Sequence, residues 1–174
     1  PPEGVPALPD NDSLVQYARS WMTGNGLSGV EVGSGQVLDR DEGAGRAFVL
    51  LKPANPANII SATPSAGITV RGDGVVVEAT INWPASMSGS TYGLRSAESL
   101  WADATQGRGF VDVNVNDLPP NFQGAAGTVS ITGSGIAYTV AGGQYLVPVV
   151  VFSGTAAIEG GSDAVPIRIY VQAA

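Results

Sequence analysis

The final segment of the sequence, residues 164–172, places the strongest constraint on the fold. Val165, Ile167, Ile169 and Val171 alternate with other residues there, so they share one side of an extended strand. Similar short runs recur along the chain, with turn residues about every 8 to 12 positions. This spacing is typical of an all-β sandwich or barrel.

The other predicted strands follow from the same alternation and from the turn residues between them. Pro148 predicts a bulge or a sheet edge in its strand, and Gly133-Ser134-Gly135 predicts the turn of a hairpin over residues 128–141. Eight to ten strands favour a single jelly-roll β-barrel, with an immunoglobulin-like sandwich as the alternative. The predicted strands cover residues 29–38, 46–51, 59–63, 67–71, 75–83, 110–117, 128–132, 136–141 and 144–154.

Two short helices are also predicted. The first begins at a cap provided by Asn11, Asp12 or Ser13 and ends before the glycines of residues 23–26. The second covers residues 96–104 with Ser96 as its cap. The side chains predicted to face inward are Leu14, Tyr17, Ala18, Trp21 and Met22 in the first helix, and Leu100, Trp101 and Ala104 in the second.

The sequence predicts one folded domain preceded by an arm. Four prolines in residues 1–10 indicate an extended segment, and residues 11–174 are expected to form a single β-barrel domain. No apolar stretch is long enough to span a membrane, and we expect no signal peptide.

Composition excludes several kinds of chemistry. The chain has no cysteine and no histidine, which removes disulfides, thiolate nucleophiles, histidine triads and the usual zinc sites. The net charge of −7 is spread along the chain without a basic patch, which argues against nucleic-acid binding. Charged residues make up only 13%, so the surface is typical of an extracellular protein or of one covered by neighbours in an assembly.

Three groups of polar residues are candidate sites, and each has a simpler structural interpretation. Asp39, Asp41 and Glu42 are typical of a solvated hairpin turn that pairs with Arg40 and Arg46. Asp112, Asn114 and Asn116 have the spacing of the first ligands of a calcium loop, but the segment lacks the glycine and the distal glutamate of such a loop. This favours their assignment to the polar face of a strand. Lys52, the single lysine, lies beside Pro53 at a strand end, and nothing in the sequence places a serine against it. We therefore expect no catalytic, cofactor-binding or metal-binding residues, no cofactor and no small-molecule substrate.

Aromatic residues could form a platform on which sugars stack, or they could fill the core. Core packing is favoured because Trp21 and Trp101 lie on the apolar sides of the predicted helices, whereas Trp83 stands at a strand end. The other residues of the set are Tyr17, Tyr92, Tyr138, Tyr145 and Tyr170.

Arg71-Gly72-Asp73 spells the tripeptide that many extracellular ligands present to integrin receptors. The same residues lie between two predicted strands, and Asp73-Gly74 is a strong turn signal because glycine accepts a positive φ. The turn interpretation is favoured over an adhesion signal.

In size and general character the chain resembles the small single-jelly-roll capsid proteins of icosahedral, membrane-containing bacteriophages from thermophilic hosts. The features that carry this resemblance are the absence of cysteine and histidine, the strand-rich pattern, the proline-rich arm and the low charge. The resemblance implies a structural, non-enzymatic coat subunit in the virion. Such a subunit would pair with itself and with a second coat protein, over a lipid membrane. No single motif carries functional residues across.

Two other functions stay open. A carbohydrate-binding or adhesin-type β-sandwich at a cell surface would need a row of exposed aromatic side chains. A glycosidase-like enzyme would need two carboxylates facing each other at about 5 to 10 Å.

Overall fold

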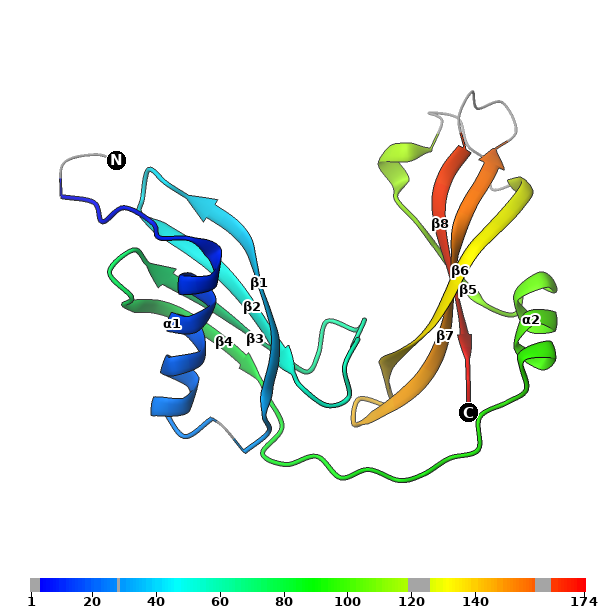
Figure 1. The fold of residues 1–174 in the computed structure, drawn as a ribbon, viewed down its shortest axis with the longest axis horizontal. Coiled ribbons are helices and arrows are strands. Elements are labelled where there is room, and N and C mark those ends of the chain that lie inside the picture. The colour runs from blue at the N-terminus through cyan, green and yellow to red at the C-terminus, as the bar shows by residue number, and fades with distance from the viewer. Residues whose placement is uncertain (1–3, 28, 119–125, 159–163) are drawn as a thin grey trace. The chain divides into compact units, whose positions relative to one another are not determined.

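The computed structural model describes residues 4–27, 29–118, 126–158 and 164–174. The chain divides into two compact units, Pro1–Ser90 and Thr91–Ala174 (Figure 1). Within the described residues, each unit contains one four-stranded antiparallel sheet and one short α-helix, which confirms the predicted all-β class. The sequence predicts one domain over residues 11–174; in the structure the buried apolar side chains form two separate cores, one in each unit.

The sheet of the first unit is a meander. Its strands pair in chain order, each antiparallel to the next, so every connection within this sheet joins neighbours. The strands are β1 (Val32–Asp41), β2 (Arg46–Pro53), β3 (Ser65–Arg71) and β4 (Val76–Asn82).

One face of this sheet is covered by helix α1 (Asn11–Gly24), as Figure 1 shows. Every second residue of β2 is buried, and Ala66, Ile68 and Val70 of β3 are buried as well. These residues meet the buried residues of α1. The core therefore lies between one helix face and the two central strands. Its buried members are Leu14, Ala18, Met22, Ala47, Val49, Leu51, Ala66, Ile68 and Val70.

The predicted first helix is confirmed, but its cap lies one residue earlier than the three candidates. The Asp10 side chain accepts a hydrogen bond from the Ser13 backbone N–H at 2.8 Å. This bond is the main reason that the pKa of Asp10 is lowered. Tyr17 is predicted to face inward but is 36% exposed. The residues of α1 that the sheet buries are Leu14, Ala18 and Met22, and Tyr17 lies beside this row.

The sheet of the second unit has the order β5-β8-β7-β6. Three consecutive strands pair as neighbours and the first strand of the unit lies beside the last, which is the order of a Greek key. The strands are β5 (Phe110–Val113), β6 (Ala126–Ala141), β7 (Tyr145–Ile158) and β8 (Ala164–Gln172).

Helix α2 (Ala97–Thr105) covers part of one face of this sheet (Figure 1). Leu100 and Ala104 pack on the alternating residues of β8, and the predicted cap Ser96 accepts a hydrogen bond from the Ser99 backbone N–H at 3.2 Å. The predicted shared face of β8 is confirmed: Val165, Ile167, Ile169 and Val171 are all buried.

The predicted hairpin over residues 128–141 is wrong. Strand β6 continues through Gly133-Ser134-Gly135, and each of these residues has a partner on β7. The hairpin turn lies later, at Gly142 and Gly143, whose φ angles are +58° and +74°. A Gly-Gly pair is itself a turn signal. Strand β7 is long enough to pair with both of the runs predicted as separate strands, residues 128–132 and 136–141.

Two further strand predictions are wrong in part. The run at 110–117 is a strand only to Val113, because the Asn114 side chain and carbonyl accept hydrogen bonds from the N–H groups of Asn116 and Asp117, which forms the 3₁₀ turn Val115–Asp117. Residues 59–63 form a loop with a single bridge at Ile59. The Lys52 ammonium donates to the carbonyls of Ile59 and Ser61, so a side chain satisfies groups that a strand would otherwise pair.

The sequence predicts that Pro148 lies at a bulge or a sheet edge. It lies on β7, a central strand, opposite Tyr138 of β6. The ladder between β7 and β8 begins one residue later, at Val149. The proline therefore stands at the end of that ladder, where a missing N–H is tolerated.

The described part of the predicted arm, residues 4–10, is extended and packs on its own unit. The carbonyl of Pro6 lies beside Gly45, and those of Pro6 and Ala7 lie beside Gly72. Arg40 Nη1 donates to the Pro9 carbonyl at 3.1 Å. The described part of the arm is thus fixed along the tips of the β1–β2 and β3–β4 hairpins. Residues 1–3 of the predicted arm lie outside the described residues.

Candidate functional site

A polar groove on the sheet of the second unit is the best candidate for a binding site. Asp112 of β5 and Arg168 of β8 are direct partners in the ladder, so their side chains share one face. Thr155 of β7 belongs to the same face through its partner Pro166. The groove has a volume of about 480 Å³, and its polar lining residues are Asp112, Asn114, Thr132, Ser153, Thr155 and Arg168.

An aromatic pair lies next to this groove on the same face. Phe110 and Tyr170 are ladder partners, their ring centroids are 6.1 Å apart, and Phe110 is 70% exposed. The Tyr170 hydroxyl donates to Asp112 Oδ2 at 3.3 Å, which links the pair to the groove. Hydroxyl, amide, carboxylate and guanidinium groups beside an exposed ring can hydrogen-bond and stack on a hydroxylated ligand.

The sequence pattern identifies only part of this groove. Asp112 and Asn114 belong to the pattern compared with a calcium loop, and the structure instead places them with Arg168 from the last strand. The alternation of residues 164–172 contained the missing signal, because it puts Arg168 and Tyr170 on the face opposite to the buried residues. The cross-strand neighbours Ser153 and Thr155 could not be identified without the pairing of β7 with β8.

Arg71-Gly72-Asp73 forms the tip of the hairpin between β3 and β4. Arg71 and Gly74 close the turn through backbone hydrogen bonds, Arg71 N to Val75 O at 2.8 Å and Gly74 N to Arg71 O at 2.9 Å. The Arg71 and Asp73 side chains bind each other, with Nε to Oδ1 at 3.1 Å, and this hydrogen bond is the main cause of the lowered pKa of Asp73. The two side chains therefore close on one another, which favours the turn interpretation over a presented adhesion signal.

The two glycines of this tip have different roles. Gly74 has φ +84°, the conformation that the predicted turn requires. Gly72 has no positive φ; a Cβ there would lie 2.9 Å from the Pro6 carbonyl oxygen and closer still to that of Ala7. Gly72 thus makes room for the arm.

Replacing Gly74 with valine should destabilise the first unit by about 1–2 kcal/mol, because a β-branched residue is strained at positive φ. The nearest atoms to a Cβ at this position are 3.5 Å away on the Tyr17 ring, so the loss would come from the backbone and not from a clash. Urea denaturation measures the effect. Gly74→Asn is the control and should lose less, since asparagine tolerates this conformation; equal stability of the valine variant and the wild type would contradict the prediction.

The acidic hairpin is confirmed as a turn held by local pairs. Arg40 lies 2.8 Å from Glu42 Oε1, and Arg46 lies 3.7 Å from Asp41 Oδ2. Asp41 Oδ1 also accepts the Ala44 N–H at 2.9 Å, so both oxygens of Asp41 are engaged by the turn.

The structure adds Glu78 to this acidic region, which the sequence did not reveal. Asp39, Phe48, Thr69 and Glu78 are successive partners across β1, β2, β3 and β4 and line a shallow pocket of about 240 Å³. Three strand spacings separate Asp39 from Glu78, which is about 14 Å. That distance exceeds the about 5 to 10 Å required of a glycosidase pair.

Lys52 lies close to a serine after all, but not as a catalytic pair. Its ammonium donates to the Ser61 carbonyl, while the Ser61 hydroxyl donates to the Thr63 carbonyl. Partial burial lowers the pKa of Lys52. The hydroxyl is directed to the loop backbone, so this arrangement fixes the loop and does not activate a nucleophile.

The aromatic residues divide between core and surface. Trp83 packs against the first core and donates its indole N–H to the Val30 carbonyl at 3.3 Å, and Trp21 is also partly buried there. The prediction that Trp101 faces the core is wrong in part, because this residue meets only the edge of Phe152, at a centroid distance of 5.5 Å, and is 47% exposed.

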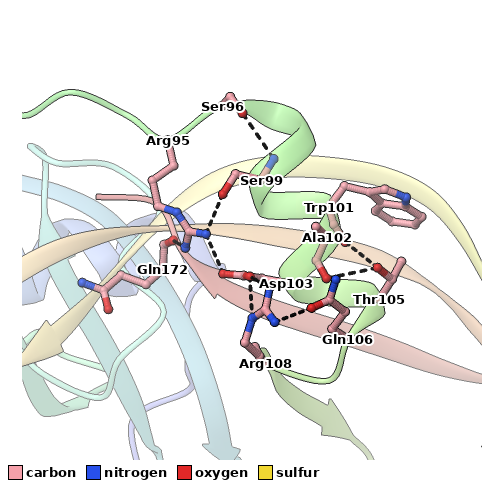
Figure 2. A network of polar contacts seen from close by, with 10 residues as sticks. All are labelled: Arg95, Ser96, Ser99, Trp101, Ala102, Asp103, Thr105, Gln106, Arg108 and Gln172. Carbon is pink, nitrogen blue, oxygen red and sulfur yellow. Dashed lines mark hydrogen bonds and ion pairs between the residues drawn. The ribbon is translucent and has the colours of Figure 1, made fainter.

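A charged network joins helix α2 to the end of β8, as Figure 2 shows. Asp103, whose side chain is 14% exposed, accepts hydrogen bonds from Arg95 at 2.6 Å and from Arg108 at 2.7 Å. Arg95 also donates to Ser99 and to the Gln172 carbonyl. The two arginines, Arg95 first, lower the pKa of Asp103. Both oxygens of Asp103 are bound by arginines of the same unit, which gives the network a structural role.

The lowered pKa of Asp103 predicts a pH dependence of stability. A carboxylate whose pKa is lower in the folded state stabilises the fold above its unfolded pKa, and this contribution is lost as the pH falls through the folded pKa. We expect acid unfolding of the second unit to begin below about pH 4, where aspartate ordinarily takes up its proton.

Asp103→Asn should lower stability at neutral pH and flatten this acid dependence, as measured by urea denaturation at a series of pH values. Ser99→Ala is the control, because it removes a neutral partner of Arg95 and should leave the pH slope unchanged. An unchanged slope in Asp103→Asn would contradict the assignment.

The described residues contain no group of three or more acidic side chains placed to hold a metal ion, and no charged side chain among them is buried. None of the described helices is long and apolar enough to cross a bilayer. Comparison with known proteins gives no matching family model and no significant similarity to a curated protein or a solved structure.

Proposed function

We propose that the chain is a structural virion protein, a coat subunit that associates with itself and assembles with a second coat protein into an icosahedral shell over a lipid membrane. The observation that supports this proposal is the sheet face of the second unit that α2 covers only in part. Three apolar residues of this face, Val111, Val129 and Ile136, are 41–53% exposed, and Trp101 of α2 is 47% exposed. Apolar residues gathered on one exposed face are typical of a surface that another protein covers.

The chemistry of the surface supports a structural role in the same way. Charged residues are few, and the charged pairs described above serve turns or hold α2 in place. A coat subunit needs extensive contact with neighbours, and a surface of small and apolar residues costs little to desolvate.

The proposal depends on the all-β class and not on the jelly roll. A jelly roll contains two Greek keys in two sheets. The second sheet has a Greek-key order, but the first is a meander. The jelly-roll barrel stays a prediction of the sequence, and an electron cryo-microscopy map of an assembled particle would test it directly.

Native mass spectrometry across a range of protein concentrations tests the proposed assembly. We expect dimers or larger species of the full chain, followed by sheets or shells in electron microscopy once the second coat protein is added. A chain that remains monomeric at high concentration, alone and with other proteins of the same particle, would overturn the proposal.

The polar groove favours a second function, a carbohydrate-binding or adhesin-type module. Its support is the exposed Phe110 beside Tyr170 and Asp112, a ring next to hydrogen-bonding groups on one sheet face. Calorimetric titration with soluble oligosaccharides tests it. Phe110→Ala and Asp112→Asn should abolish any binding, whereas Tyr92→Ala, at an exposed site outside the groove, should not; the absence of binding to every sugar tested would exclude this function.

A further inference from the structure

We propose that the outer edge of β6 pairs with the same edge of a second copy of the chain, which joins two four-stranded sheets into one of eight strands. This inference rests on the proposed function, because it identifies the surface through which the subunit associates with itself. β6 stands at the end of the strand order and pairs with β7 on one side only within the described residues. Its other side presents backbone N–H and C=O groups that a further strand can bind.

The length of β6 sets it apart from ordinary edge strands. It covers 16 residues, whereas strands in globular proteins usually have about 3 to 10. The other three edges are shorter: β5 has 4 residues, β4 has 7 and β1 has 10. The register with β7 is unbroken from Gly133 to Ala141, so a regular stretch of nine residues is available for pairing.

The composition of β6 removes the usual protection of an edge. Soluble proteins place charges or prolines on edge strands to prevent pairing. The other three edges follow this rule, since β1 contains Asp39 and Asp41, β4 contains Glu78 and β5 contains Asp112. β6 contains neither a charged residue nor a proline.

These charges also indicate that the partner is a second copy. Two chains that each have a net charge of −7 repel one another, and pairing through β1, β4 or β5 would bring carboxylates of the two copies together. β6 is the one edge of the described sheets at which two copies can meet without like charges. Antiparallel pairing of β6 with β6 of the second copy satisfies two-fold symmetry, so both copies use the same surface.

The exposed apolar residues of β6 agree with this arrangement. Val129 and Ile136 are 41% and 46% exposed. They share the sheet face of the buried residues, because their ladder partners Ala156 and Val150 face the α2 side. Across a β6–β6 junction these residues would meet their counterparts from the other copy and lose exposed area.

Hydrogen exchange of the wild-type chain at low and high concentration tests the edge directly. Amides of β6 that point away from β7 should become protected as the concentration rises, while exchange of the β4 edge should not change. The test does not depend on a substitution and therefore not on the folding of any variant.

A charged variant gives a second test by sedimentation equilibrium. Ser134→Lys places a lysine on each copy within the exposed, regular part of the edge and should weaken the dimer at least about tenfold, because like charges then face each other. Gln144→Lys is the matched control, since it adds the same charge at the exposed β6–β7 turn, and it should leave the dimer unchanged.

The outcomes separate this inference from the proposed function. A dimer in which β6 amides are not protected, and which Ser134→Lys and Gln144→Lys affect equally, would overturn the β6 edge and leave self-association standing. A chain that is monomeric at all concentrations would overturn both. Concentration-dependent protection of β6 together with selective weakening by Ser134→Lys supports both.

Discussion

Gly154→Ala is expected to destabilise the second unit by about 3 kcal/mol, the upper part of the usual range for overpacking. A Cβ at this position would lie 2.9 Å from Ile131 Cα and closer still to the Ser130 carbonyl oxygen. Both atoms belong to the backbone of β6, so no rotation of a side chain can relieve the clash. The register of β6 with β7 shifts beside this point, between Ile131 and Gly133, and the close approach of the two backbones requires a glycine.

The control for this variant is Gly135→Ala, on the neighbouring strand. No atom lies within 4 Å of a Cβ built there, so its effect should stay within about 0.5 kcal/mol. Urea denaturation, followed by hydrogen exchange of peptides from residues 126–158, measures both. Equal stabilities of the two variants would show that β6 and β7 do not approach as closely as described.

Ile68→Ala should lower the free energy of unfolding of the first unit by about 2–5 kcal/mol, the range for truncating a buried isoleucine or leucine. Ile68 is fully buried at the centre of β3, between Val49 of β2 and Ala79 of β4 in the ladder, and belongs to the core under α1. Removing three carbons leaves a cavity that a helix and a sheet, both fixed by other contacts, cannot close.

Val77→Ala is the matched control, because Val77 is 53% exposed on the adjacent strand and should lose less than about 0.5 kcal/mol. Hydrogen exchange resolved by peptide would show where stability is lost. Loss confined to residues 4–90 in Ile68→Ala would agree with separate cores in the two units, and equal loss in residues 91–174 would contradict it.

The predictions that the structure confirms depend on short segments of sequence. Ser96 caps α2 and the alternating residues of β8 are buried, because a cap or a strand face is specified by residues within a few positions of one another. The turn at Gly74 is also predicted correctly from local sequence, because the positive φ angle of this one residue requires a glycine.

The predictions that failed depend on distant partners. Gly133-Ser134-Gly135 has the composition of a turn, yet it is held extended because β7 offers a partner to each residue. Trp101 lies on the apolar side of α2, but in the folded unit it meets only the edge of Phe152 and stays 47% exposed. The conformational preference of a short segment is therefore overridden by its contacts with neighbouring strands and helices.

The candidate groove shows the same division. Asp112 and Asn114 could be selected from a local pattern, while Arg168, Ser153 and Thr155 join them only through the order β5-β8-β7. The arm is another example: its prolines predict an extended segment, but only the structure shows that Gly45 and Gly72 receive it.

By itself, the sequence determined the all-β class, the two helices and most strand positions, because alternation and caps act between residues close in the chain. Only the tertiary structure decided the division into two cores, the groove and the unprotected edge of β6. Those features depend on which strands become neighbours, and the free energy of pairing depends on contacts between residues far apart in the sequence.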